Sequence, residues 1–285
     1  MGLRRDGSIA VFLRPIGSMA TTSGWCSGRS IALDLKGSQT LKGCIVRIIV
    51  LRTGDALPPV AEKNGEFFDF IKRTVGDTWA HDWESLDVRV PDVALPDPET
   101  AAAFIITGSA SSVTERAPWM LRTEEYVRRI VAAEVPLLGI CFGHQLIGQA
   151  LGGEVAKNPR GREIGTVRLE VSEDDLLLEG QPSAFDVQST HSDSVVRLPP
   201  GARVHASTAL EPNTIFSVGP LVRAVQHHPE MDDAVIRGYI EARFEIIQSE
   251  GLDAAKLLNS VRPTPENGRT LRNFVRNFCA RPAVA

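Results

Sequence analysis

The sequence predicts an α/β fold with a mostly parallel central sheet that is covered by helices on both faces. Short apolar runs of strand character alternate with segments of helical character from residue 45 onward. Parallel strands need crossover connections, usually helices, and the resulting sheets are buried on both faces. The chain has 285 residues, 43% of them hydrophobic, which is enough for one large domain or two small ones with a substantial core.

The first half of the predicted domain alternates regularly between strands and helices. Residues 45–51 form an apolar run that is typical of a buried strand. The segment 123–133 carries two glutamates near its start and two arginines further on, which suits the dipole of a helix. In chain order, we expect a helix at 66–71, a weak strand at 86–90, a strand at 102–106, a helix at 123–133, a strand at 136–140 and a helix at 142–151.

The second half changes character after Gly152. We expect shorter strands at 166–171, 203–207 and 221–226. From Asp232 onward the pattern is helical, and two prolines separate the last helix from the others. The helices are expected at 233–249, at 253–260 and near 269–278.

Residues 1–44 differ from the predicted domain at 45–285. They contain six basic and two acidic residues, are rich in Gly and Ser, and show no sustained hydrophobic period. Three interpretations stay open: a transit peptide, a disordered tail, or a start codon assigned too early. We favour the last, with the native protein starting near Val46. N-terminal sequencing of the native protein decides between them.

Composition argues against several classes of protein. The net charge is −4, which does not suit a nucleic-acid binder. No apolar run approaches the roughly 18–20 residues that span a bilayer. The four cysteines match no zinc pattern and no disulfide framework, so we expect a cytoplasmic protein without a metal or another cofactor.

The chemistry is concentrated around Cys141, in the stretch Gly139-Ile140-Cys141-Phe142-Gly143. An apolar strand runs into a nucleophile that has glycines two residues before and two after it, and a helix follows at once. This is the elbow arrangement of serine hydrolases with cysteine in place of serine. The N-terminus of a helix favours a thiolate, and its free N–H groups can hold an oxyanion. The alternative is a buried structural cysteine.

A second motif is Gln226-His227-His228-Pro229-Glu230. The strand at 221–226 leads to His228, which can act as general base and acid, and Glu230 can orient its imidazole. We expect His227 to point away from His228, because strand side chains alternate. His144, on the helix after the elbow, is expected to be packed. Residues 161–165 form either a binding loop over the site or a solvated turn.

These motifs resemble those of class I glutamine amidotransferases, the triad type. The similarity is greatest to stand-alone members related to the glutaminase half of GMP synthetase, and it spans roughly residues 45–280. The resemblance implies a flavodoxin-like domain. The matching stretches are Ile106-Thr107-Gly108-Ser109, Gly139-Ile140-Cys141-Phe142-Gly143-His144-Gln145, Thr190-His191-Ser192-Asp193 and Gln226-His227-His228-Pro229-Glu230.

The resemblance implies a role for each matching residue. Cys141 would attack the γ-carbonyl of glutamine, His228 would move the proton to the leaving ammonia, and Glu230 would hold His228. The family usually shows two glycines where Gly108 and Ser109 stand here, so the oxyanion loop must accommodate a Cβ. The oxyanion hole would be formed by Gly108, Ser109 and Phe142, and the substrate's backbone would be contacted by Gln145, His191 and Ser192.

Three functions stay open at this point. The first is a hydrolase that releases ammonia from glutamine, alone or for a separate synthase subunit. The second is a γ-glutamyl peptidase that acts on γ-glutamyl amides with the same triad. The third is a non-catalytic regulatory or partner-binding relative, against which the intact triad argues. GMP synthetase also needs an ATP-dependent domain, and the chain contains no Gly-x-x-x-x-Gly-Lys-Ser/Thr phosphate loop.

Overall fold

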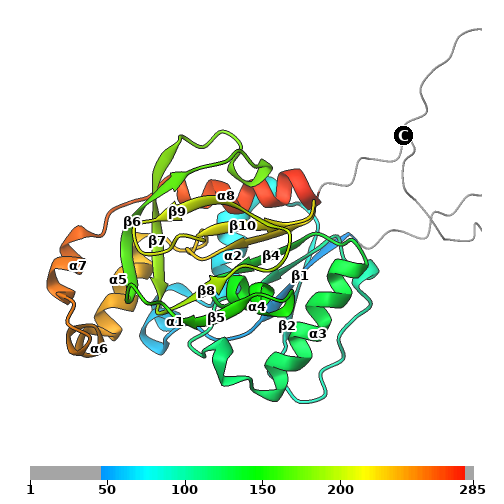
Figure 1. Cartoon of the computed structure of the whole chain (residues 1–285), viewed down its shortest axis with the longest axis horizontal. Helices are drawn as coiled ribbons and strands as arrows, with labels where there is room; N and C mark the ends of the chain where they lie inside the picture. Colours follow the sequence, from blue (N-terminus) through cyan, green and yellow to red (C-terminus); the bar gives the residue numbers. More distant parts are fainter. Residues whose placement is uncertain (1–45, 280–285) are drawn as a thin grey trace, which may run out of the picture. The chain divides into compact units, whose positions relative to one another are not determined.

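The computed structural model describes residues 46–279, so the predicted leader at 1–44 lies outside the described residues. Nine strands form one sheet in the order β2-β1-β3-β4-β11-β10-β9-β6-β7, and β5 pairs with β8 in a second, two-stranded sheet (Figure 1). The strands are β1 (Arg47–Arg52), β2 (Asp82–Asp87), β3 (Ala103–Ile106), β4 (Leu137–Ile140), β5 (Glu154–Lys157), β6 (Glu163–Val171), β7 (Ala184–His191), β8 (Asp193–Arg197), β9 (Ala202–Thr208), β10 (Ile215–Val218) and β11 (Val222–Val225).

Helices make the connections between the parallel strands. The α-helices are α1 (Pro58–Asn64), α2 (Phe67–Val75), α3 (Pro118–Ala132), α4 (Phe142–Ala150), α5 (Asp233–Ala242), α6 (Phe244–Ser249), α7 (Ala254–Ser260) and α8 (Asn267–Phe274). Short 3₁₀ turns lie at Gly76–Thr78, Pro98–Thr100, Val113–Glu115 and Leu176–Leu178, and a π-helical turn at Val275–Cys279 continues α8.

The strand β1 shows why both faces of the sheet are covered. Its side chains alternate between the two faces, and four of them are fully buried. Ile48 and Val50 pack with residues of α2 and α8, whereas Ile49 and Leu51 pack with residues of α3 and α4. The predicted α/β class, with a central parallel sheet and helices on both faces, is confirmed.

The two halves of the large sheet differ in strand direction. The strands β2, β1, β3, β4 and β11 run parallel to their neighbours. The pairs that continue the sheet, from β11 through β10, β9 and β6 to β7, are antiparallel. The strand β11 therefore belongs to both halves and lies beside β4 at the centre of the sheet. Because β4 precedes Cys141 and β11 precedes His228, the centre of the sheet brings the two motifs together.

Some elements differ from their predicted bounds. The weak strand expected at 86–90 lies at Asp82–Asp87, because its register is set by all six residues of β1 and the chain turns at Arg89, whose N–H bonds to Asp87. The helix expected at 233–249 is broken at Arg243, between α5 and α6. Residues 163–165 of the stretch expected to be a loop or turn belong to β6.

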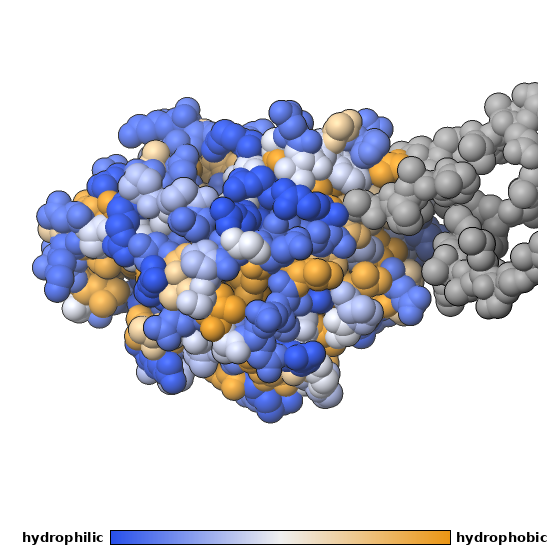
Figure 2. All heavy atoms as spheres, turned by 90° about the horizontal axis from the view of Figure 1, so that it is seen from above, coloured by the Kyte–Doolittle hydropathy of each residue, from blue (hydrophilic) through white to orange (hydrophobic). Residues whose placement is uncertain are grey.

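The surface in Figure 2 is largely hydrophilic, with smaller apolar areas between the charged residues. The large hydrophobic side chains that are exposed are scattered over several elements, and comprise Val90, Leu121, Leu176, Val196 and Ile246. Among residues 46–279, none of the helices has the length and apolar character that a membrane crossing requires.

Candidate active site

Cys141 lies in a strained turn between the end of β4 and the start of α4. Its backbone has φ 52° and ψ −102°, a conformation that non-glycine residues rarely adopt. The turn is held at its amide, because the N–H of Cys141 donates to the carbonyl oxygen of Val225, 2.8 Å away. This contact ties the nucleophile directly to the end of β11.

The glycines on either side of Cys141 are required by close packing. A Cβ at Gly139 would lie 2.4 Å from the carbonyl oxygen of Gly143, and a Cβ at Gly143 would lie 2.5 Å from the carbonyl oxygen of Ile106. Both contacts are with backbone, which cannot move aside without displacing the strand or the helix. The glycine spacing seen in the sequence thus reflects the close approach of α4 to β3 and β4.

His228 is placed beside Cys141 by the neighbouring strand β11. Its N–H donates to the carbonyl oxygen of Gln188 at 2.8 Å, and its ring stacks on Phe67 with a centroid distance of 6.2 Å and an angle of 15° between the planes. A Cβ at Gly108 would come within 2.9 Å of the ring carbon Cε1 of His228. Glycine at position 108 therefore leaves the room that the imidazole occupies.

The carboxylate of Glu230 orients the imidazole of His228. The Nδ1 atom of His228 lies 2.7 Å from Oε1 of Glu230, and both side chains are buried. The turn between them is fixed by Asn267, whose amide donates to the carbonyl oxygens of His228 and Met231. The Nε2 atom of His228 has no hydrogen-bond partner among the described residues. It is therefore available to the thiol and to a substrate.

The electrostatics of the site favour a thiolate facing an imidazolium. Burial raises the pKa of Cys141, but the positive charge on His228, helped by His191, outweighs burial and lowers this pKa below that of an ordinary thiol. Burial lowers the pKa of His228, but Glu230 and Cys141 outweigh it and raise this pKa to about 10. The coupled pair therefore holds its proton on His228 at neutral pH.

A small pocket opens onto Cys141 and His228. Its wall combines residues of the motifs with residues that have no motif of their own: Asp55, Leu57, Phe67, Ser109, Ala110, Cys141, Thr190, His228, Tyr239 and Arg243. Asp55, Tyr239 and Arg243 could not be found from the sequence, because they come from a loop and from the broken helix. The break between α5 and α6 is what carries Arg243 to the pocket.

Arg243 and Asp55 give the pocket wall one group of each charge. Arg243 donates to Oγ1 of Thr190 at 3.2 Å, and among the described residues no carboxylate lies within salt-bridge distance of it. Burial lowers the pKa of Arg243, and the neighbouring charge of Arg162 adds to the effect. Arg162 itself pairs with Glu250. The guanidinium of Arg243 is thus left to a ligand, whereas Asp55 is paired on one side with Arg89.

The residues expected to form the oxyanion hole lie around the same pocket. Phe142 is the first residue of α4, where backbone N–H groups have no acceptor within the helix. Ser109 lines the pocket, and its hydroxyl accepts from the N–H of Ser111 at 3.2 Å. The Cβ of Ser109 is accommodated because residue 54, which faces it, is a glycine.

The three residues expected to contact the substrate's backbone lie behind the pocket rather than in its wall. The amide of Gln145 donates to the carbonyl oxygen of Asp193 and to Oε1 of Gln226, and Ser192 is only partly buried. His191 is buried, and both its ring nitrogens have partners, the Asp193 carbonyl oxygen and Glu163. Direct contact of these side chains with a substrate stays a prediction.

The two other histidines of the motifs are buried away from water. His144 lies on α4, and its Nε2 donates to the carbonyl oxygen of Asn213 at 2.8 Å. Neither ring nitrogen of His227 has a partner among the described residues. Burial lowers the pKa of each to about 3, so both are neutral at pH 7.

Comparison with known proteins identifies the family to which this geometry corresponds. The family described as "Glutamine amidotransferase class-I" matches residues 80–244, a stretch that includes Cys141, His228 and Glu230. The GMP synthase [glutamine-hydrolyzing] of Aeropyrum pernix is 38% identical over 138 residues, which cover 48% of this chain and 25% of that protein. The chain thus spans about a quarter of that relative's length.

Two further relatives match most of their own length. Gamma-glutamyl peptidase 3 of Arabidopsis thaliana is 26% identical over 230 residues, which cover 74% of this chain and 91% of that protein. The crystal structure of a glutamine amidotransferase from Thermotoga maritima superposes with a TM-score of 0.67 at 21% identity, covering 82% of this chain and 98% of that chain. At this identity the structural likeness establishes the fold alone.

Proposed function

Because the chain belongs to the class I glutamine amidotransferase family, we propose that it hydrolyses the γ-amide bond of a glutamyl substrate through a thioester on Cys141. The observation that carries the proposal is the arrangement of Cys141, His228 and Glu230. The first two meet at the ends of the neighbouring strands β4 and β11, and Glu230 binds the imidazole from behind. This is the geometry of a nucleophile, a base and an orienting acid.

The reaction follows from these positions in two steps. In the first, the thiolate of Cys141 attacks the γ-carbonyl carbon, and the backbone N–H groups of Phe142 and Ser109 stabilise the oxyanion. The C–N bond then breaks, and the nitrogen leaves with the proton held by His228. In the second, His228 takes a proton from water as the water attacks the thioester. The C–S bond breaks, which restores Cys141 and releases the glutamyl carboxylate.

The charges around the pocket suit the α-amino acid end of a glutamyl group. The guanidinium of Arg243, which has no carboxylate partner among the described residues, can bind the α-carboxylate. The carboxylate of Asp55 lines the same pocket and can bind the α-ammonium group. We propose that these two residues orient the substrate so that its γ-carbon lies at Cys141.

Glutamine is our first candidate for the substrate, with ammonia as the product. The likeness to the glutamine-hydrolysing GMP synthase supports it. Since the chain spans only a quarter of that relative, we propose that the ammonia is used by a separate synthase subunit. The substrate and the partner are both testable with the purified protein.

A γ-glutamyl peptide is the second candidate, with a peptide or amino acid as the leaving group. The likeness to gamma-glutamyl peptidase 3 supports it, because the match covers 91% of that protein. The two candidates share the triad and differ only in the group on the nitrogen side of the γ-amide.

One experiment separates the candidates. Purified protein is incubated with glutamine and, separately, with a panel of γ-glutamyl peptides, and the release of ammonia and of free amine is measured. Ammonia release from glutamine supports the first candidate, and cleavage of peptides alone supports the second. A Cys141→Ala variant is the control, and no turnover of either substrate, with or without candidate synthases, would overturn the enzymatic proposal.

A further inference from the structure

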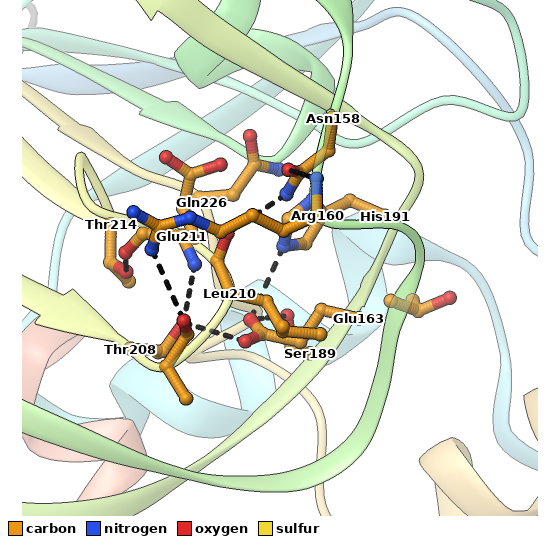
Figure 3. A network of polar contacts seen from close by, with 12 residues as sticks. Asn158, Arg160, Glu163, Ser189, His191, Thr208, Leu210, Glu211, Thr214 and Gln226 are labelled. Carbon is orange, nitrogen blue, oxygen red and sulfur yellow. Dashed lines mark hydrogen bonds and ion pairs between the residues drawn. The ribbon is translucent and has the colours of Figure 1, made fainter.

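The last three residues of β7 link the active site to a buried polar network (Figure 3). Side chains on a strand alternate between its faces, so Ser189 and His191 share one face and Thr190 has the other. Thr190 lines the pocket with Cys141, whereas Ser189 and His191 are buried behind it. Anything that fixes Ser189 and His191 therefore also fixes Thr190.

Glu163 fixes both of these residues from the adjacent strand. It lies opposite His191 in the antiparallel pairing of β6 and β7. Its Oε2 accepts from the hydroxyl of Ser189 at 3.2 Å and from Nε2 of His191 at 3.3 Å, and its Oε1 accepts from the hydroxyl of Thr208 on β9 at 2.6 Å. One carboxylate thus connects three strands directly behind the pocket.

Thr190 is in contact with two groups that matter for the reaction. Its carbonyl oxygen lies 3.7 Å from Sγ of Cys141 and accepts the hydrogen of the thiol. Its hydroxyl accepts from Arg243 at 3.2 Å. A shift of Thr190 would therefore move both the resting position of the nucleophile and the guanidinium that faces the substrate.

The network also places a charge behind the nucleophile. Burial lowers the pKa of His191, but its hydrogen bond to Glu163 outweighs burial and raises this pKa, which favours the imidazolium. The other acidic group near His191 is Glu211, whose pKa burial raises, which favours its neutral form. The positive charge of His191 in turn favours the thiolate of Cys141.

We propose that Glu163 and His191 are positioning residues of the hydrolytic reaction: together they hold Thr190 against Cys141 and Arg243, and the imidazolium of His191 stabilises the thiolate. The proposal rests on the proposed function, in which Cys141 is the nucleophile. It gives His191 a role through Cys141 and Thr190 in place of direct contact with the substrate.

The test measures the reactivity of Cys141 without any substrate. The rate at which iodoacetamide alkylates Cys141 is followed against pH, with the modified peptide identified by mass spectrometry and with Cys141→Ala as the blank. In Glu163→Gln and in His191→Gln the midpoint of this profile should move upward by up to about one pH unit, because a nearby positive charge is lost. Glu163→Asp, which keeps the carboxylate, should recover most of the shift.

Turnover provides the second measurement. With the substrate that the wild-type protein hydrolyses, we expect kcat/KM of Glu163→Gln and His191→Gln to fall between about tenfold and 100-fold, as for a reacting group displaced by about 1 Å. Thr208→Val removes one bond to Glu163 and keeps both charges, so it should lower kcat/KM without moving the alkylation midpoint. This variant also provides a test should His191→Gln fail to fold.

A matched control removes another buried histidine of the same sheet. His205 on β9 is buried, and its Nε2 lies 2.8 Å from the hydroxyl of Ser217. His205→Asn should leave the midpoint unchanged. Wild-type midpoints in both Glu163→Gln and His191→Gln, or an equal shift in His205→Asn, would overturn the proposal. If the wild-type protein hydrolyses neither substrate, the proposed function fails, while the alkylation midpoints still test the positioning pair.

Discussion

The Nδ1 atom of His228 donates to Oε1 of Glu230 across 2.7 Å, and only 2% and 1% of the two side chains are exposed. This pair is sealed from water, so the orientation of the imidazole is decided by one carboxylate. The relationship makes Glu230 an orienting group that never touches the substrate.

The first prediction therefore ranks the members of the triad. In a serine protease, loss of the nucleophile costs about 10⁶-fold in kcat and loss of the acid about 10⁴-fold. We expect Cys141→Ala to be on the order of 100-fold worse than Glu230→Gln, measured as kcat on the preferred substrate. Glu241→Gln, an exposed glutamate on α5, is the control. Equal losses in the two triad variants would contradict the assigned roles.

The second prediction concerns the pH dependence of activity. The pKa of Cys141 is lowered from the ordinary thiol value, and that of His228 is raised to about 10. We expect kcat/KM to rise with pH as Cys141 loses its proton below pH 9, and to fall near pH 10 as His228 loses the proton needed by the leaving group. Both limbs belong to the coupled pair.

The falling limb gives a sharper form of this prediction. Because the charge of Glu230 raises the pKa of His228, Glu230→Gln should move the falling limb to lower pH. The profile of kcat/KM is measured from pH 5 to pH 11 at constant ionic strength. A falling limb at the same pH in Glu230→Gln and in the wild-type protein would argue against His228 as the acid.

The third prediction tests the close packing of the elbow. In Gly143→Ala the new Cβ would lie 2.5 Å from the carbonyl oxygen of Ile106, so α4 and β3 must separate. We expect the free energy of unfolding to fall by about 1–3 kcal/mol and the remaining activity to be low, because the strain displaces Cys141. In Gly201→Ala, where no atom lies within 4 Å of the new Cβ, stability alone should change. Urea denaturation and kcat/KM are measured on both variants.

The fourth prediction concerns Arg243 and the substrate carboxylate. Arg243→Gln removes the guanidinium from the pocket wall and leaves the triad in place. We expect KM to rise by about 10- to 100-fold with a smaller change in kcat, because a charge-assisted hydrogen bond of about 1.5–3 kcal/mol is lost. Arg168→Gln, a change on the exposed part of β6, is the control. An unchanged KM would exclude the proposed role.

The fifth prediction concerns stability in acid. The pKa of His227 is about 3 in the folded protein against an ordinary value of 6.5. Between these values the unfolded chain binds a proton that the folded protein does not. The contribution to stability is therefore present above pH 6.5 and is lost as the pH falls toward 3, by up to about 1.4 kcal/mol per pH unit.

The variant His227→Gln removes this proton uptake. The free energy of unfolding is measured by urea denaturation at pH 7.5, 6.0 and 5.0, and the variant should lose less stability on acidification than the wild-type protein. Part of the slope should persist, since the pKa of His144 is also about 3. His81→Gln, at an exposed position, is the control. An unchanged slope in His227→Gln would contradict the prediction.

The parallel half of the fold could be predicted from the sequence because its signals are local. The strands β1, β3 and β4 are unbroken apolar runs, since both their faces are buried. The elbow shows itself through Gly139 and Gly143, where any larger residue would collide with backbone. The candidate nucleophile and the His-Pro-Glu motif were visible for the same reason.

The antiparallel half could not be predicted so well, because its strands bury polar side chains. The strand β7 ends in Gln188, Ser189, Thr190 and His191, all buried and hydrogen-bonded, so it carries no apolar pattern at that end. The pocket residue Arg243 gave no signal either. It lies within a segment whose helical pattern is continuous, and the break at that point depends on packing against distant residues.

The pairing of β11 with β4 has a consequence for the identity of the base. Val225 lies opposite Ile140, and the strand continues into two successive histidines, of which only His228 faces the pocket. A slip of one residue along this hydrogen-bond ladder would exchange the faces and present His227 instead. The choice between two chemically identical imidazoles is therefore written in the alignment of two strands, and catalytic competence depends on the accuracy with which the chain folds at its centre.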